Sequence, residues 1–124
     1  MQEEIKTEIK EVIVENKYIS IDDFAKVEIK LGTINAAEVV EGSEKLYKLS
    51  VDFGEEKMRT VFSGIRKFVT IEDLIGKQLP FVTNLEPRKM MGEYSEAMIL
   101  AASEGEALAL LTPTQKLSNG VKLR

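Results

Sequence analysis

The residues best suited to chemistry in this chain are two adjacent cations, Arg88 and Lys89, followed by Met90, Met91 and Gly92. Guanidinium and ammonium groups neutralise phosphate, and methionine offers soft contact area for a base or for another protein. The five residues lie in a polar segment with turn residues, and loops on rigid scaffolds commonly carry binding residues. The segment therefore predicts a binding site. The alternative is that the two methionines are buried beneath the loop.

Three polar or soft side chains flank this segment: Asn84 before it, and Ser95 and Met98 after it. A hydroxyl at Ser95 is able to bond a phosphate or a base edge, and Met98 is able to pack on a base. Taken singly, the two residues are equally explained as a turn hydroxyl and a core side chain.

The composition argues against catalysis, because the chain has no histidine, cysteine or tryptophan. Without histidine there is no ordinary proton shuttle near neutral pH and no nucleophile–histidine arrangement. A zinc site would have to consist of carboxylates alone, and no glycine-rich phosphate loop is present. We expect no enzyme, no metal site and no cofactor.

The net charge of −4 at first argues against a nucleic-acid partner, but its distribution changes this interpretation. Residues 1–25 contain seven acids and three lysines, whereas residues 26–124 contain fourteen charges of each sign. Residues 45–89 contain nine basic and six acidic side chains. Local potential decides whether phosphate is attracted, so the middle of the chain remains a candidate RNA surface.

The positions of these residues depend on strands, which period-two alternation predicts in five places. The ranges are 27–31 with a continuation to 40, 47–53, 59–63, 79–83 and 98–102. Lys30, Lys48 and Arg59 fall opposite the apolar faces, as groove cations or as members of a salt-bridged surface. Residues 84–96 are expected to be a long loop, residues 107–111 a returning strand, and residues 121–123 a short edge strand.

Two short helices complete the pattern. Residues 20–24 form a capped turn opened by Ser20, and residues 70–73 form a capping box that ends at Gly76. Five strands with a helix between the third and fourth indicate an all-β, five-stranded OB-fold barrel with short helices and a C-terminal extension. Residues 1–19 are an acidic leader, helix or tail, and residues 20–124 are the domain.

No apolar run is long enough to span a membrane, and the N-terminal sequence does not resemble a secretory signal. A small chain without cysteine favours a cytoplasmic location.

Several ordered blocks resemble the tRNA-binding domain family, which is appended to methionyl-tRNA synthetase and also occurs as free-standing tRNA-binding proteins. The blocks are residues 22–32, 41–46, 51–54, 61–66, 84–90 and 95–102. The resemblance covers residues 20–124 and is nearest to the C-terminal domain, or separate β-subunit, of that synthetase.

The resemblance implies a non-catalytic module that binds tRNA by backbone and shape and assists an aminoacyl-tRNA synthetase in cis or in trans. It also implies a homodimer joined through elements around the barrel, including the C-terminal segment. The implied tRNA-binding residues are Lys30, Lys45, Asn84, Arg88, Lys89, Ser95 and Met98.

Two positions depart from the family pattern. The family often has arginine where Lys30 stands and usually glycine where Ala97 stands. The first change weakens a bidentate phosphate contact, and the second limits close backbone approach. A rival interpretation is a protein-interaction or export-chaperone module on the same barrel, which would suit exposed methionines and the acidic leader.

Overall fold

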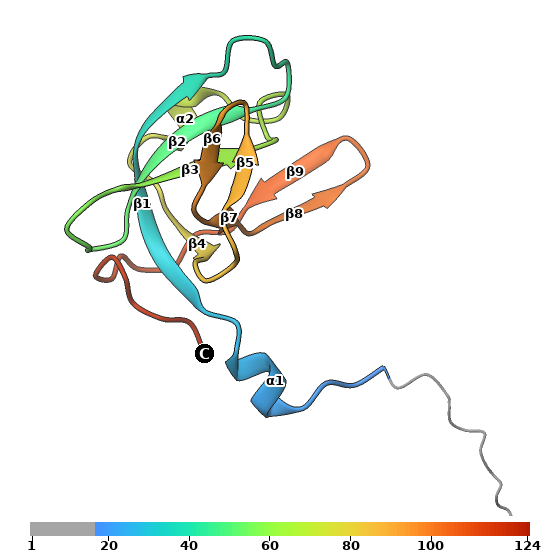
Figure 1. Cartoon of the computed structure of the whole chain (residues 1–124), viewed down its shortest axis with the longest axis vertical. Coiled ribbons are helices and arrows are strands. Elements are labelled where there is room, and N and C mark those ends of the chain that lie inside the picture. The colour runs from blue at the N-terminus through green and yellow to red at the C-terminus, as the bar shows by residue number, and fades with distance from the viewer. Residues whose placement is uncertain (1–16) are drawn as a thin grey trace, which may run out of the picture.

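The computed structural model describes residues 17–124, so residues 1–16 of the acidic leader, expected to be a helix or a tail, lie outside the described residues. Five antiparallel strands curl into a nearly closed barrel in the order β3-β2-β1-β4-β7 (Figure 1). Their bounds are β1 Ile29–Val39, β2 Tyr47–Asp52, β3 Arg59–Ser63, β4 Gln78–Val82 and β7 Met98–Ile99. The architecture confirms the predicted all-β, five-stranded OB-type barrel.

Strand β1 is long enough to pair with two different strands, one along each half of its length. Its first half pairs with β4, its second half pairs with β2, and the register shifts between Ile34 and Ala36. Gly32 precedes this shift, in the part of β1 that pairs with β4, and an added Cβ there would stand 2.6 Å from the ring of Phe53. Since that separation is far below van der Waals contact, glycine permits the close approach of strand and ring.

The barrel interior consists of aliphatic and aromatic side chains from alternate strand positions. The largest fully buried side chains are Phe81, Ile34, Leu49, Leu74, Leu79, Val51 and Val61. Phe53 and Phe81 meet edge to face, with ring centroids 5.3 Å apart. This apolar packing is the rigid support for everything the surface carries.

Both predicted helical turns are present. Helix α1 (Ile21–Ala25) begins after Ser20, whose hydroxyl accepts the Asp23 N–H at 3.0 Å, and it buries none of its residues. Helix α2 (Ile71–Leu74) begins after Thr70 and buries Leu74 in the core. The second helix therefore covers one end of the barrel, whereas the first lies on its outside.

The prediction of a structureless loop over residues 84–96 is wrong. Strands β5 (Arg88–Met90) and β6 (Glu93–Ser95) form an antiparallel hairpin. Met91 and Gly92 form its two-residue turn, with φ of 51° and 84°. Positive φ at both central positions is what a type I′ turn requires, and it is usually supplied by Asn-Gly. The unusual Met-Gly pair concealed the hairpin.

The predicted fifth strand at 98–102 is also wrong in extent, because it divides at Leu100. Strand β7 pairs with β4, whereas β8 (Ala101–Glu104) pairs with β9 (Ala107–Leu110) in a separate hairpin. The Leu100 N–H donates to the Pro80 carbonyl at 3.1 Å, but proline has no N–H to return the bond. Pro80 lies in the middle of β4, and the ladder to β7 stops there.

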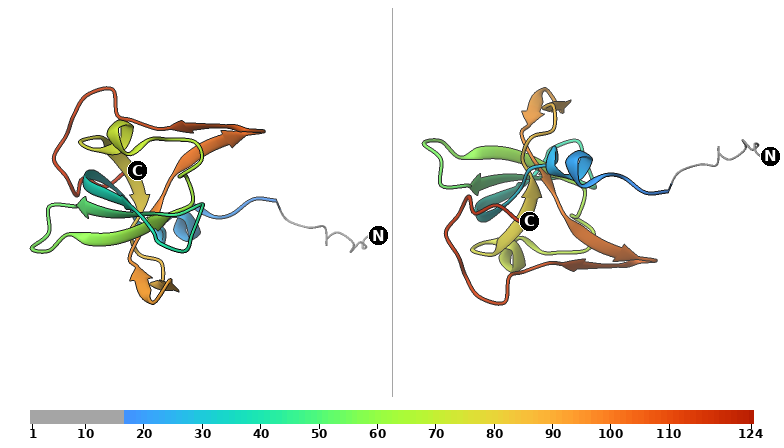
Figure 2. Two further views of the ribbon diagram at one scale, coloured as in Figure 1. Left: turned by 90° about the horizontal axis from the view of Figure 1, so that it is seen from above. Right: turned by 90° about the horizontal axis from the view of Figure 1, so that it is seen from below.

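The C-terminal extension returns to β1, as the expected edge strand at residues 121–123 requires. The Leu123 N–H donates to the Ile29 carbonyl at 2.8 Å, and Lys122 bridges Lys30. Figure 2 shows this segment and the β5–β6 hairpin on opposite sides of the barrel. Among residues 17–124 there is no helix of the length and apolar character that a membrane crossing needs.

Candidate nucleic-acid interface

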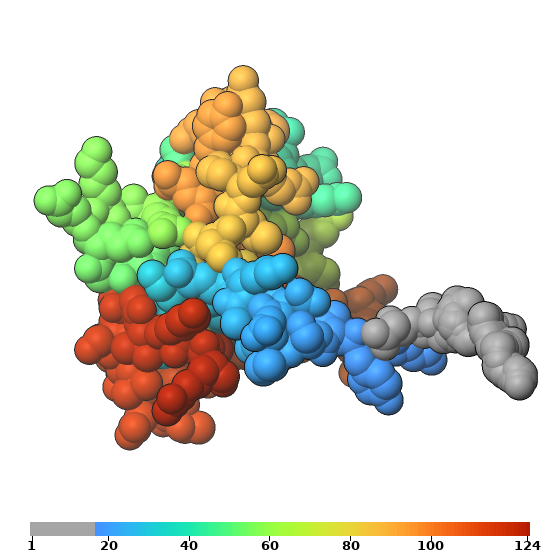
Figure 3. Space-filling model, turned by 60° about the horizontal axis from the view of Figure 1, so that its bottom comes forward, coloured from blue at the N-terminus to red at the C-terminus, as the bar shows by residue number. Residues whose placement is uncertain are grey.

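The β5–β6 hairpin projects from the barrel as a separate ridge, which rises above the rest of the surface in Figure 3. Arg88 lies opposite Ser95, Lys89 opposite Tyr94, and Met90 opposite Glu93. Because neighbouring residues of a strand point to opposite faces, Arg88 and Lys89 point to different sides of the ridge. The hairpin thus offers one cation on each face.

The Arg88 face encloses a pocket of about 320 Å³ between the hairpin, β3 and β7. Its lining includes Phe62, Leu85, Arg88, Met90, Ser95 and Met98. Most of these side chains are apolar, and the wall also carries two charged residues of opposite sign, Arg88 and Glu86. Such a pocket accommodates a flat apolar group, such as an unstacked base, while the cation contacts the phosphate beside it.

Two predicted site residues use their polar atoms within the chain. Ser95 is buried, its hydroxyl accepts the Phe62 N–H at 3.0 Å, and it donates to the Ala97 carbonyl at 3.1 Å. Asn84 accepts the Glu28 N–H at 2.9 Å and donates to the Lys26 carbonyl at 2.7 Å. These bonds fix the ends of the segment that carries the hairpin.

Lys45 lies in the loop between β1 and β2. The Ser43 hydroxyl accepts the Lys45 N–H, and the Arg66 guanidinium donates to the Ser43 carbonyl. An added Cβ at Gly42 in this loop would stand 3.4 Å from the methyl group of Met91. The structure therefore brings the loop that carries Lys45 against the hairpin turn at Gly42, and Lys45 is not among the residues that line the pocket.

Lys30 lies apart from the hairpin tip, on β1. Its ammonium is 3.6 Å from a carboxylate oxygen of Glu28, and its backbone bridges Lys122. The nearest counter-charge offsets much of its attraction for phosphate. Of the seven predicted residues, Arg88, Ser95 and Met98 line one pocket, and Lys89 points to the opposite face of the hairpin. The other three, Lys45, Asn84 and Lys30, do not line this pocket.

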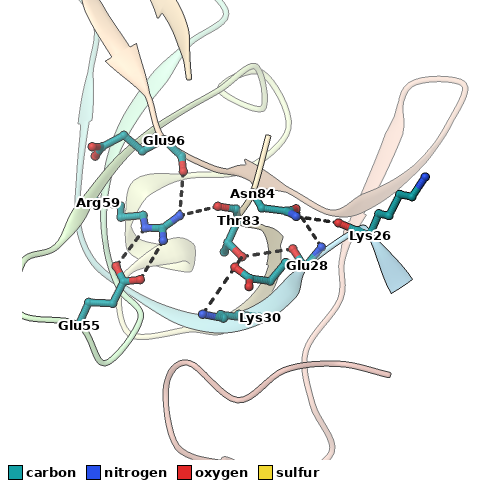
Figure 4. Close-up of polar contacts among 8 residues, drawn as sticks. All are labelled: Lys26, Glu28, Lys30, Glu55, Arg59, Thr83, Asn84 and Glu96. Carbon is teal, nitrogen blue, oxygen red and sulfur yellow. Dashed lines mark hydrogen bonds and ion pairs between the residues drawn. The ribbon is translucent and has the colours of Figure 1, made fainter. Parts of the chain in front are cut away.

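A polar network lies beneath the hairpin and connects β1, β3 and the end of β4 (Figure 4). Arg59 forms a bidentate pair with Glu55, with N–O distances of 3.0 and 2.8 Å. The Arg59 hydrogen bonds hold the pKa of Glu55 below its ordinary value. Thr83 donates to Glu28 at 2.7 Å, and this bond, followed by the charge of Lys30, lowers the pKa of Glu28.

The tip of the hairpin has an ion pair of its own. Lys48 on β2 lies 2.9 Å from a carboxylate oxygen of Glu93. Hydrogen bonding to Glu93 is the largest cause of the raised pKa of Lys48. The pair connects the hairpin to the barrel, and it agrees with the second of the two expectations for Lys48, a member of a salt-bridged surface.

Some lining residues escape sequence reasoning. Phe62 carries a detectable signal, because Val61-Phe62 breaks the alternation of β3 and indicates that both faces are covered. Leu85 is a single apolar residue in a polar stretch and is 51% exposed. No strand or helix periodicity includes it, so nothing in the sequence indicated that it lines the pocket. In the described part of the chain, no group of three or more acidic side chains is placed to hold a metal ion.

A nearly closed five-stranded antiparallel barrel with one short helix between its third and fourth strands defines an OB-type barrel. The chain belongs to the family described as "Putative tRNA binding domain", whose model matches residues 29–122. The resemblance inferred from the motif blocks is thereby confirmed.

Similar curated proteins include methionine–tRNA ligases. The chain is 42% identical over 120 residues to the ligase of Campylobacter jejuni, and the aligned region makes up 97% of this chain and 19% of that protein. It is 48% identical over 102 residues to the ligase of Helicobacter pylori strain J99, covering 82% of this chain and 16% of that protein. The chain thus spans less than a fifth of the length of these two ligases.

Solved structures share the whole architecture. A MetRS related protein from Pyrococcus horikoshii superposes with a TM-score of 0.82 at 32% identity, covering 88% of this chain and all of that one. The chaperone CsaA of Bacillus anthracis superposes with a TM-score of 0.76 at 32% identity, covering 86% and 99%. The fold is therefore shared by proteins with two differently described roles.

Proposed function

We propose that this chain is a non-catalytic module that binds tRNA by backbone and shape and assists an aminoacyl-tRNA synthetase, the methionyl enzyme, in cis or in trans in the cytoplasm. The observation that carries this proposal is the β5–β6 hairpin, which presents Arg88 and Lys89 on its two faces and a pocket at its base. Family membership and the likeness to methionine–tRNA ligases support the choice of tRNA.

The seven site residues have two proposed roles. Arg88, Lys89 and Lys45 contact phosphate, Met98 packs against a base in the pocket, and Lys30 adds a weaker positive charge. Asn84 and Ser95 act through the backbone that they hold, because their polar atoms are bonded within the chain.

The test is a gel-shift titration with total cellular tRNA at two salt concentrations, on the wild type and on the variant Arg88→Ala/Lys89→Ala. Binding driven by counterion release weakens steeply with salt. Loss of two phosphate contacts lowers the affinity and reduces the slope of log K against log salt by roughly 1.4 to 1.8. An unchanged affinity in the double variant would overturn the site.

The proposal includes a homodimer formed over the C-terminal extension. An apolar hollow of about 360 Å³ lies there, lined by residues including Leu31, Pro80, Leu111, Leu117 and Val121. Covering this surface with a second copy would remove apolar area from water. Sedimentation equilibrium of the wild type and of Leu117→Asp tests this part: a dimer that becomes a monomer supports it, and a monomeric wild type excludes it.

The second candidate function is protein interaction of the chaperone kind. The likeness to CsaA favours it, and so does the exposure of Met91, which is 51%. Purification from cells distinguishes the two functions, since a tRNA-binding module copurifies with RNA that ribonuclease removes. Recovery of unfolded polypeptide without RNA would support the second function and contradict the first.

A further inference from the structure

Arg59 hydrogen-bonds to both ends of the segment that carries the hairpin. Its Nη1 atom donates to the Thr83 carbonyl at 2.7 Å and to the Glu96 carbonyl at 3.2 Å. Thr83 is the last residue before the segment 84–95, and Glu96 is the first residue after it. One nitrogen of β3 therefore joins the two points where the hairpin segment leaves and re-enters the barrel (Figure 4).

The guanidinium of Arg59 is itself held in place by contacts with Glu55 and with the ring of Phe53. Nε and Nη2 donate to the two oxygens of Glu55, and the group lies over the Phe53 ring, 5.4 Å from its centroid. Four of the five N–H groups that arginine carries are used in these bonds and in those to the carbonyls. The side chain is 23% exposed. A group so fully engaged is poorly placed to grip a phosphate.

Each end of the segment is also bonded to a different part of the barrel, one to β3 and the other to the residue before β1. At the 96 end, the Glu96 N–H donates to the Thr60 carbonyl and the Glu96 carboxylate accepts the Thr60 N–H, both at 2.8 Å. At the 83 end, the Thr83 N–H donates to the Glu28 carbonyl at 2.8 Å. The first set of bonds reaches β3 and the second reaches the residue before β1, so Arg59 spans the gap between them.

The hairpin depends on this base for its direction. It has three cross-strand pairs, and two-stranded hairpins of this size are marginal in water without further packing. We propose that Arg59 is a positioning residue for RNA binding, which fixes the direction of the β5–β6 hairpin and thereby the places of Arg88 and Lys89. This inference rests on the proposed tRNA-binding function and adds a residue that acts through the hairpin backbone.

A double-mutant cycle tests the inference with Arg59→Lys, which keeps the charge but has no planar fork to reach a carboxylate and two carbonyls together. The tRNA affinity is measured for the wild type, Arg59→Lys, Arg88→Ala/Lys89→Ala and the combination. We expect Arg59→Lys to weaken binding about threefold or more in the wild-type background and by less than about twofold when the hairpin cations are absent. Arg124→Lys is the matched control and leaves the affinity unchanged.

Additive losses would overturn the inference, because a direct phosphate contact or a general loss of folded protein reduces affinity equally in both backgrounds. Amide hydrogen exchange gives a readout that does not depend on tRNA. We expect faster exchange of the Glu96 and Phe62 amides in Arg59→Lys, with the Leu49 and Val61 amides of the barrel unchanged. Unchanged exchange at Glu96 and Phe62 also overturns it. A wild type that binds no tRNA overturns the proposed function instead.

A second variant is needed if the barrel amides of Arg59→Lys also exchange faster, which would mean that this substitution destabilises the whole fold. Glu55→Gln removes the charge that holds the guanidinium and leaves every side chain at the hairpin base in place. The same cycle with Glu55→Gln is expected to show non-additivity of the same sign and smaller size. Additive losses in that cycle overturn the inference as well.

Discussion

The barrel and the β5–β6 hairpin are stabilised by different interactions. The barrel is held by apolar side chains that are almost completely buried, such as Phe81 and Leu79. The hairpin has exposed side chains along most of its length and is joined to the barrel by polar bonds at its base and by the Lys48–Glu93 pair at its tip. Changes in the barrel should therefore alter stability, whereas changes in the hairpin should alter binding.

This difference explains how a small domain combines rigidity with an accessible binding surface. Burial in the barrel supplies the main favourable free energy of folding and is not weakened by the screening that salt exerts on charges. The hairpin contributes little to that free energy and is free to present charges that salt screens. The predictions below test this division, starting with the change expected to have the largest effect.

The largest effect is expected from an aromatic residue of the barrel. Phe81→Ala removes a fully buried ring that meets Phe53 edge to face, so the free energy of unfolding should fall by about 3–5 kcal/mol. The matched change on the hairpin is Tyr94→Ala, at a residue 57% exposed, and it should stay within about 0.5 kcal/mol. Urea unfolding measures both. Similar losses in the two variants would contradict the division.

The next effect concerns the base of the hairpin. Ser95→Ala leaves the buried Phe62 N–H without its acceptor, which should cost about 1–3 kcal/mol. Ser103→Ala, at an exposed position of β8, is the control and should be nearly neutral. Unfolding experiments on both variants, followed by tRNA titration, separate a loss of stability from a loss of affinity. A neutral Ser95→Ala would show that the base is not tied by this bond.

Alternation and turn residues were enough to predict the barrel. Val27, Ile29 and Leu31 marked β1, and Ser20 and Thr70 marked the two helical turns, because these signals are local. The hairpin was missed for an equally local reason: Met91 stands where asparagine is usual, so its positive φ had no signature.

The candidate site was predicted only as a set of residue types. Arg88 and Lys89 were identified from the sequence, but their placement on opposite faces depends on a register that the sequence did not reveal. The role of Arg59 depends on backbone carbonyls at Thr83 and Glu96, and any residue carries such an acceptor. Contacts to the backbone across distant segments leave no pattern in a single sequence.

The third prediction separates the two faces of the hairpin. Both Arg88→Ala and Lys89→Ala should reduce the slope of log K against log salt by about 0.7–0.9, since each removes one phosphate contact. Arg88→Ala should lower the affinity more, because Arg88 also lines the pocket with Met90 and Met98. Lys116→Ala, on the opposite side of the barrel, is the charge-matched control. Equal losses for Arg88 and Lys89 would show that the pocket contributes nothing.

The smallest expected effect is the pH dependence of the Glu55–Arg59 pair beneath the hairpin. The hydrogen bonds from Arg59 lower the pKa of Glu55 in the folded state from an ordinary value of 4.5. A lowered folded pKa means that the ionised carboxylate stabilises the fold at pH values above 4.5. That contribution is lost as the pH falls through the folded pKa, because the unfolded state then binds the proton first.

Glu55→Gln removes this contribution while keeping the size of the side chain. The difference in unfolding free energy between the wild type and Glu55→Gln should be constant near neutral pH and should shrink as the pH falls below 4.5. Urea unfolding of both proteins at several pH values between 3 and 7 measures it. Because Glu55 is partly exposed, solvent screening keeps the effect small. A difference that does not depend on pH would mean that the charge of Glu55 adds no stability to the folded state.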